Sequence, residues 1–156
     1  MSSSKNLETS KALSVGDEGT RVEAFARSHV GKVREENQDR FLLDLVPEWG
    51  VQGALVAMVA DGMGGHQGGS QAAQIAVETV FQSLTQSPPE VRLYEQLQNS
   101  FVDADEAIRR RAKEDANLTT MGTTGVAAVC FPSECVHLYT GDSRLYHFRK
   151  GELIYQ

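Results

Sequence analysis

The sequence is poor in the residues and segments that mark several common classes of small protein. Among its 156 residues only Cys130 and Cys135 are cysteines, which excludes a secreted scaffold held by several disulfides, and their spacing is not that of a zinc finger. The longest strongly apolar run, 54–60, is far shorter than the roughly 20 residues that cross a bilayer. The serine-rich start has no apolar stretch of the kind found in secretory signals. The sequence therefore predicts a soluble, cytoplasmic protein that does not engage a membrane.

Positive charge is also scarce. Lys and Arg number 15 against 21 Asp and Glu, which gives a formal net charge of -6. Non-specific nucleic-acid binding depends on cationic side chains that replace counterions on phosphates, so this balance argues against a nucleic-acid partner and suits divalent cations better. With 40% hydrophobic and 23% charged residues, the chain has enough apolar material for a core, which argues against wholesale disorder.

The chain divides into a tail and one domain. Residues 1–19 are polar and without hydrophobic periodicity, so we predict a flexible tail there, followed by a domain over 20–156. Apolar residues spaced as on one face of a helix predict helices over 73–84 and 93–108. Apolar or alternating runs predict strands at 21–26, 40–45, 54–60, 125–130, 135–140, 144–148 and 152–155. The glycines within 61–65 are expected to interrupt both strand and helix.

The order of these elements predicts an α+β layered fold. Connections of a few residues between neighbouring strands indicate antiparallel pairing, because a parallel crossover needs a dozen or more residues. The sequence stops directly after its last predicted hairpin, which would leave an open sheet edge. We therefore expect the sequence to be cut short.

Three aspartates adjoin predicted strands and are candidate metal ligands. Asp39 precedes one strand, Asp61 follows the most apolar strand, and Asp142 lies in a turn between two later strands. If these strands are neighbours, the carboxylates gather at one rim of a sheet, where oxygen ligands select hard ions such as Mg²⁺ or Mn²⁺. Gly62 lets the main chain approach a ligand, so its carbonyl is a further candidate. Taken alone, Asp142 and Asp39 fit ordinary turn and strand-flanking positions better, and Asp61 fits either interpretation equally.

Two further side chains are candidates for phosphate chemistry. The guanidinium of Arg34 has the planar fork that holds a phosphate with two hydrogen bonds, although in isolation an Arg beside Glu35 and Glu36 is more simply a surface residue. His66 has the pKa range of a proton donor but is equally placed to cap the helix that follows.

Four segments in order resemble those of the PPM (PP2C-type) metal-dependent protein serine/threonine phosphatases, in their bacterial form. They are residues 31–39 (GKVREENQD), 59–66 (VADGMGGH), 121–124 (MGTT) and 140–146 (TGDSRLY). The resemblance runs from about Thr20 to Gln156. It implies a β-sandwich of two antiparallel sheets flanked by helices, in α-β-β-α layers, with a two-metal centre of Mg²⁺ or Mn²⁺ at one end.

The resemblance also implies a role for each matching residue. Asp39 would bind one metal, Asp61 would bridge both, and the Gly62 carbonyl would complete that side. Arg34 would hold the substrate phosphate. Asp142 matches an aspartate that binds a further, weaker metal.

The implied reaction is hydrolysis of phosphoserine or phosphothreonine in phosphorylated proteins. A hydroxide that bridges the two metals would attack phosphorus in line, because two divalent ions lower the pKa of the water between them. The leaving alkoxide would take a proton from a metal-bound water or from His66. In many relatives a His directly follows the Asp-Gly pair, and here that place holds Met63.

Family members continue beyond this point into segments that supply more metal ligands, and this leaves an alternative open. The chain covers somewhat more than half of such a domain. The alternative is a catalytically incomplete pseudophosphatase, or a regulatory module that binds phosphoproteins. A small α+β domain with incidental Asp turns is a third interpretation.

Overall fold

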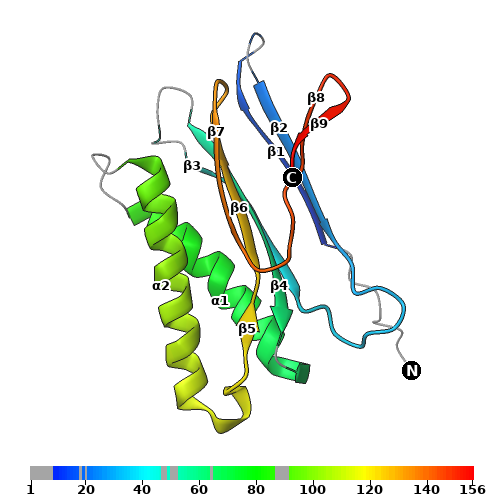
Figure 1. Cartoon of the computed structure of the whole chain (residues 1–156), viewed down its shortest axis with the longest axis vertical. Helices are drawn as coiled ribbons and strands as arrows, with labels where there is room; N and C mark the ends of the chain where they lie inside the picture. The colour runs from blue at the N-terminus through cyan, green and yellow to red at the C-terminus, as the bar shows by residue number, and fades with distance from the viewer. Residues whose placement is uncertain are drawn as a thin grey trace.

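A five-stranded antiparallel sheet forms the centre of the molecule and separates two helices from a second layer of strands (Figure 1). The computed structural model describes residues 9–17, 19, 21–46, 49, 53–63, 65–86 and 92–156. In this part of the chain the strands are β1 (Thr9–Gly16), β2 (Arg21–Ser28), β3 (Asp39–Val46), β4 (Ala54–Met63), β5 (Gly122–Thr123), β6 (Gly125–Cys130), β7 (Cys135–Thr140), β8 (His147–Arg149) and β9 (Glu152–Tyr155). The helices are α1 (Gly65–Gln86), α2 (Leu93–Glu114) and a short 3-10 turn at Ala116–Leu118.

The main sheet has the order β3-β4-β6-β7, with β5 paired to the end of β4. All of its pairings are antiparallel. Helix α1 packs on β3 and β4, and α2 packs on α1 and β7, so both helices cover the same face of the sheet. This arrangement confirms the mixed fold with antiparallel sheets. Within the described residues both helices belong to one outer layer.

Strand β4 is apolar along most of its length because one face is buried throughout and the other face is covered over its first half. Val56, Met58 and Ala60 pack in the core cluster beneath the two helices. Leu55, which points to the other face, joins a separate cluster with Val15 and Leu43. Successive side chains of a strand point to opposite faces, so a central strand between two layers needs apolar residues at consecutive positions. That requirement explains the run from which the strand was predicted.

Two hairpins form the second layer. The antiparallel pair β1-β2 lies over β3 and β4 on the face away from the helices (Figure 1). The β8-β9 hairpin reaches the same face at its end, where the ring of Tyr155 contacts His137 of β7 in a tilted arrangement, with 5.2 Å between ring centroids.

The glycines after Asp61 do not interrupt the elements, contrary to the sequence prediction. Strand β4 continues to Met63 and α1 begins at Gly65. A Cβ on Gly62 would overlap the carbonyl group of Gly69 in the first turns of α1, and a Cβ on Gly69 would lie 2.8 Å from the Gly62 carbonyl carbon. Gly62 therefore permits close contact between β4 and α1 rather than forming a loop.

Other boundaries also differ from the predictions. The prediction of a flexible tail is wrong for Thr9–Gly16, because these residues form β1 and pair with β2 along its length. Residues 1–8 lie outside the described part. The strand expected at 144–148 is confined to His147–Arg149, and the two-residue strand β5 was not expected. Among the described residues, no helix is long and apolar enough to cross a membrane.

Candidate metal centre

The pairing of β3 with β4 places Asp39 directly opposite Asp61. Asp39 is the first residue of β3, and its register partner across the sheet is Asp61, near the end of β4. Asp39 is half-buried and Asp61 is exposed. Residues directly opposite in an antiparallel pair present side chains on the same face, so the two carboxylates are neighbours. Of the three aspartates predicted to gather at one rim of a sheet, the structure places these two side by side.

The charge balance at this pair is unfavourable when nothing else is bound. Burial raises the pKa of Asp39, and the negative charge of Asp61 and a side-chain hydrogen bond with it raise that pKa further. The positive charges of Arg34 and Arg40 act in the opposite direction. Two carboxylates in this position repel one another unless a cation or a shared proton lies between them.

The backbone around Asp61 is held by two threonines that adjoin β5. The Thr124 hydroxyl accepts a hydrogen bond from the Asp61 N–H at 3.1 Å, and the Thr124 N–H donates to the Asp61 carbonyl at 3.0 Å. The Thr123 hydroxyl donates to the same carbonyl at 3.0 Å. Thr124 is buried, and its hydroxyl also shares a 2.6 Å hydrogen bond with Ser143. The sequence indicated the motif 121–124 but not this function.

Arg40 holds the start of β3 in the same way. Its guanidinium donates to the backbone carbonyls of Asn37 and Asp39, both at 2.8 Å. It also donates to Ser70 and Gln74 on α1, both at 3.0 Å. The Asn37 side chain accepts from the Asp39 N–H at 3.1 Å. These contacts fix Asp39 relative to α1, and sequence reasoning missed Arg40 because an Arg beside a strand has no distinctive pattern.

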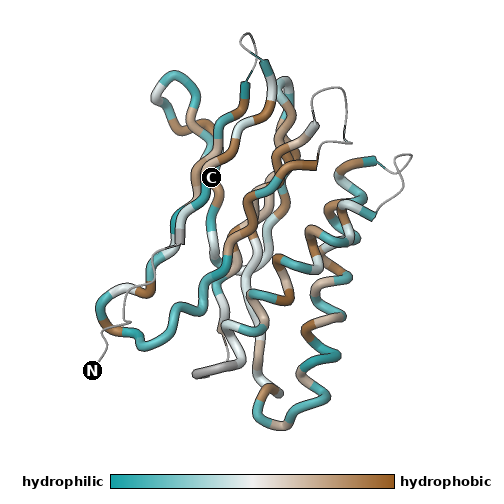
Figure 2. Tube along the Cα trace, turned by 180° about the vertical axis from the view of Figure 1, so that it is seen from behind, coloured by the Kyte–Doolittle hydropathy of each residue, from teal (hydrophilic) through white to brown (hydrophobic). Residues whose placement is uncertain are grey.

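A cavity of about 690 Å³ lies beside the aspartate pair and gathers most of the predicted site residues. Its lining includes Arg34, Asp61, Gly62 and Asp142. Arg34 comes from the connection between β2 and β3, which Figure 2 shows as mostly hydrophilic, and Asp142 comes from the segment after β7. Arg34 and Asp142 are more than one hundred residues apart in the sequence, so this cavity brings distant segments of the chain together.

The donor set fits a hard divalent cation, but only in part. The two opposed carboxylates provide oxygen ligands and negative charge, which such ions prefer. Asp142 lines the cavity without joining the pair: in the described part of the chain, no group of three or more His, Cys, Asp or Glu side chains is close enough to hold a metal. His66 belongs to the first turn of α1, and its side chain lies outside the described residues.

Comparison with known proteins decides the family. The model of the protein phosphatase 2C family matches residues 27–154. The chain belongs to the protein phosphatase 2C family. It is 32% identical over 128 residues to the serine/threonine protein phosphatase PstP of Mycobacterium tuberculosis, a match that covers 82% of this chain. It is 31% identical over 132 residues to the serine/threonine phosphatase stp of Listeria innocua, which covers 80% of this chain.

Solved structures agree with this assignment. The catalytic domain of PstP in complex with two manganese ions superposes with a TM-score of 0.63 at 25% sequence identity, and the match covers 95% of this chain and 53% of that one. The chain spans 49% of the Listeria phosphatase and 23% of the mycobacterial one. The fold is thus that of the protein phosphatase 2C family over about half of the matched catalytic domain.

Proposed function

We propose that this chain supplies one side of the metal centre of a metal-dependent protein serine/threonine phosphatase. The observation that carries the proposal is the register of β3 and β4, which sets Asp39 opposite Asp61, together with the cavity that Asp61 and Arg34 line. Membership of the protein phosphatase 2C family and the manganese in the PstP catalytic domain support the same activity. The proposed substrates are phosphoserine and phosphothreonine in proteins.

Asp39 and Asp61 are the proposed metal ligands, with the Gly62 carbonyl beside them and Asp142 as ligand of a further, weaker ion. The proposed ions are Mg²⁺ or Mn²⁺, in a two-metal centre. When bound, such ions lower the pKa of water and neutralise phosphate charge. The raised pKa of Asp39 is the electrostatic reason to expect binding, because a cation between the two carboxylates relieves their repulsion.

Arg34 is the proposed phosphate-binding residue. It is exposed and lines the same cavity as Asp61, so its guanidinium is free to meet a ligand from solvent. Two parallel N–H donors of a guanidinium match two phosphate oxygens, which orients the phosphate as well as binding it. Thr124 and Arg40 support this arrangement indirectly, because their side chains hydrogen-bond to the backbone of Asp61 and Asp39, respectively. His66 stays a candidate proton donor on sequence grounds.

The test measures Mn²⁺ binding by calorimetry and, in parallel, phosphate release from a phosphopeptide. We expect Asp61→Asn to lose Mn²⁺ binding. The matched control is Asp44→Asn, because Asp44 lies on the same strand as Asp39 but forms an ion pair with Lys11 outside the cavity. Equal Mn²⁺ affinity in wild type and Asp61→Asn would reject the metal assignment. Binding of Mn²⁺ and phosphopeptide without hydrolysis would favour the alternative, a phosphoprotein-binding module.

A further inference from the structure

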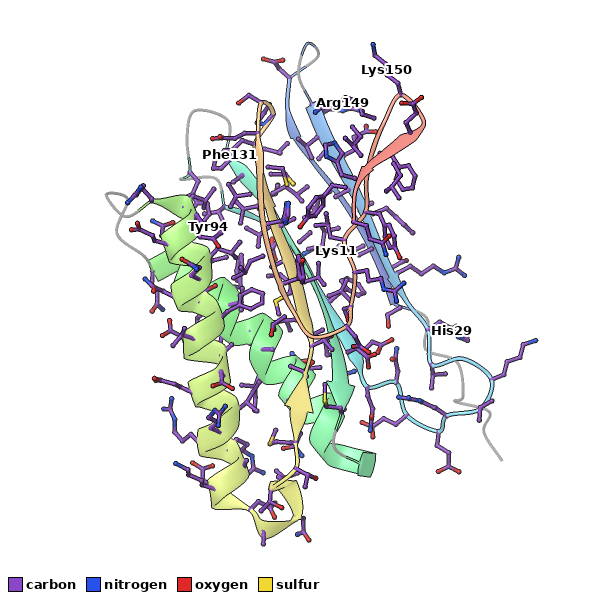
Figure 3. The ribbon with its side chains drawn as sticks, viewed as in Figure 1. Lys11, His29, Tyr94, Phe131, Arg149 and Lys150 are labelled. Atoms are coloured by element: carbon purple, nitrogen blue, oxygen red, sulfur yellow. The ribbon has the colours of Figure 1, made fainter. Side chains whose placement is uncertain are left out.

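Two thiols face each other at the end of the β6-β7 hairpin that lies away from the candidate metal centre. Cys130 ends β6 and Cys135 begins β7, and they are register partners across the hairpin. Their Sγ atoms are 2.8 Å apart, and both cysteines are free thiols. Figure 3 shows the neighbouring Phe131 near this end of the hairpin. The other end of β6 begins at Gly125, next to Thr124.

The backbone geometry of this pair suits a disulfide. The Phe131 N–H donates to the Glu134 carbonyl at 2.8 Å, so residues 131 and 134 form a hydrogen-bonded pair of the ladder. The alternation of an antiparallel ladder makes the adjacent pair, Cys130 and Cys135, a non-hydrogen-bonded one. Such pairs have Cα atoms about 4.5 Å apart, within the roughly 4.4–6.8 Å that disulfides span. Bond formation therefore requires no movement of the strands.

The two thiols differ in ways that suit two different steps. Cys135 is exposed, whereas Cys130 is half-buried between Cys135 and Leu55 of β4. A hydrogen bond from Cys130 lowers the pKa of Cys135 to about 7, against the opposing effect of partial burial. The same hydrogen bond, together with burial, raises the pKa of Cys130. Cys135 is thus the accessible thiolate, and Cys130 is the protonated partner beside it.

We propose that Cys130 and Cys135 form a redox-active dithiol that a low-molecular-weight disulfide oxidises to an intramolecular disulfide. In the first step the Cys135 thiolate attacks one sulfur of the small disulfide, which forms a mixed disulfide and releases one small thiolate. In the second step Cys130 gives up its proton, and its sulfur attacks the Cys135 sulfur and releases the second small thiol. Two protein thiols are oxidised and one small disulfide is reduced to two thiols. The proposal does not depend on phosphatase activity.

The experiment incubates the full chain with glutathione disulfide at neutral pH, quenches with acid and measures the intact mass. We expect the mass to fall by that of two hydrogen atoms, with no glutathione retained, and dithiothreitol to restore the original mass. A chain that keeps both thiols in excess glutathione disulfide, or that accumulates glutathione adducts, would overturn the proposal. The wild-type result decides the matter even if a variant folds poorly.

Single variants separate the two steps. Cys130→Ser should stop at a stable adduct with one glutathione on Cys135, because no second thiol is present to release it. Cys135→Ser should react on the order of tenfold more slowly, because only the half-buried thiol with the raised pKa remains. Equal rates of adduct formation in the two variants would contradict the assignment of Cys135 as nucleophile.

Discussion

At the scale of single residues, the candidate metal centre depends on side chains that hold the backbone of the two aspartates. Asp61 is exposed, yet the hydroxyl of Thr124 accepts its N–H, and two further hydrogen bonds from Thr123 and Thr124 reach its carbonyl. A backbone held at both polar groups has little freedom to rotate, so the position from which the carboxylate extends is set before any ligand arrives. The two threonines are therefore positioning residues in the proposed centre.

Thr124→Val tests this role. The substitution keeps the shape of the side chain but removes the acceptor for the Asp61 N–H and the partner of the Ser143 hydroxyl. The groups left without partners are only partly buried, so we expect the free energy of unfolding in urea to fall by about 1 kcal/mol, the usual net contribution of a hydrogen bond. Thr124→Ser keeps the hydroxyl and serves as control. A Thr124→Val chain as stable as wild type would mean that water replaces the lost bonds.

The thiol of Cys135 gives a pH-dependent prediction. Its pKa is lowered to about 7, from an ordinary value of 9.0, by the hydrogen bond from Cys130. Only the thiolate reacts with iodoacetamide, so the rate of alkylation at Cys135 should rise as pH increases and reach half its maximum near pH 7. In Cys130→Ala, which has no donor at that position, we expect the midpoint to move upward. Mass spectrometry of the labelled peptide measures both, and an unchanged midpoint in the variant would contradict the donor role of Cys130.

At the scale of elements, the tightest contact is the one between the end of β4 and the first turns of α1. Gly62 and Gly69 meet there, and neither has a side chain. A Cβ added to Gly68 would lie 3.1 Å from the Cβ of Met121. The contact sets the distance between the strand that carries Asp61 and the helix that anchors Arg40. Small residues at these positions are thus a condition for bringing β3, β4 and α1 together.

Gly62→Ala should show the cost of separating the two elements. The added methyl group would overlap the Gly69 carbonyl, which belongs to the backbone and is unable to rotate away. We expect a loss of about 3 kcal/mol in the free energy of unfolding, near the upper end of the usual cost of overpacking. Gly122→Ala is the matched control, because its added methyl would meet the Met63 side chain at an ordinary 3.5 Å. Similar losses in both variants would argue against a specific role for the β4-α1 contact.

The elements that sequence reasoning found are those with strong local patterns. The apolar run of β4 and the periodic stripes of α1 and α2 reflect burial, which leaves a direct trace in the sequence. Strand β1 leaves only a short trace, because Leu13 and Val15 pack inward while Ser10, Ala12 and Ser14 are exposed. Gly62 was misinterpreted for another reason. A glycine that permits close packing and one that forms a turn look the same until the partner is known.

At the scale of the whole molecule, metal binding should stabilise the fold. A ligand that binds only the folded state at one hundred times its Kd adds about 2.7 kcal/mol, which for a chain of this size raises the Tm by roughly 5–10 °C. We expect Mn²⁺ to produce such a shift in wild type and in Asp44→Asn, but not in Asp61→Asn. Differential scanning calorimetry with and without a chelator measures it. A shift that persists in Asp61→Asn would place the ion elsewhere.

The proposed ligands of the candidate centre are visible in the sequence, but the residues that hold them in place are not. Carboxylates beside strands, and an arginine near them, are visible in a sequence because few residue types perform those tasks. The hydrogen bonds of Thr124 and Arg40 join segments far apart in the chain, and they depend on which strands become neighbours. Asp142 illustrates the limit, since it reaches the cavity lining without joining the aspartate pair.

The alternation of β4 has a consequence for how this chain tolerates changes in length. Ala60 and Gly62 point toward the helices, while Asp61 between them points to the opposite face and meets Asp39. Adding or deleting one residue upstream in the strand would exchange these directions, and would turn the carboxylate into the tight space beside α1. A substitution in β4 therefore changes one side chain, whereas an insertion or deletion of one residue moves every later side chain of the strand to the opposite face.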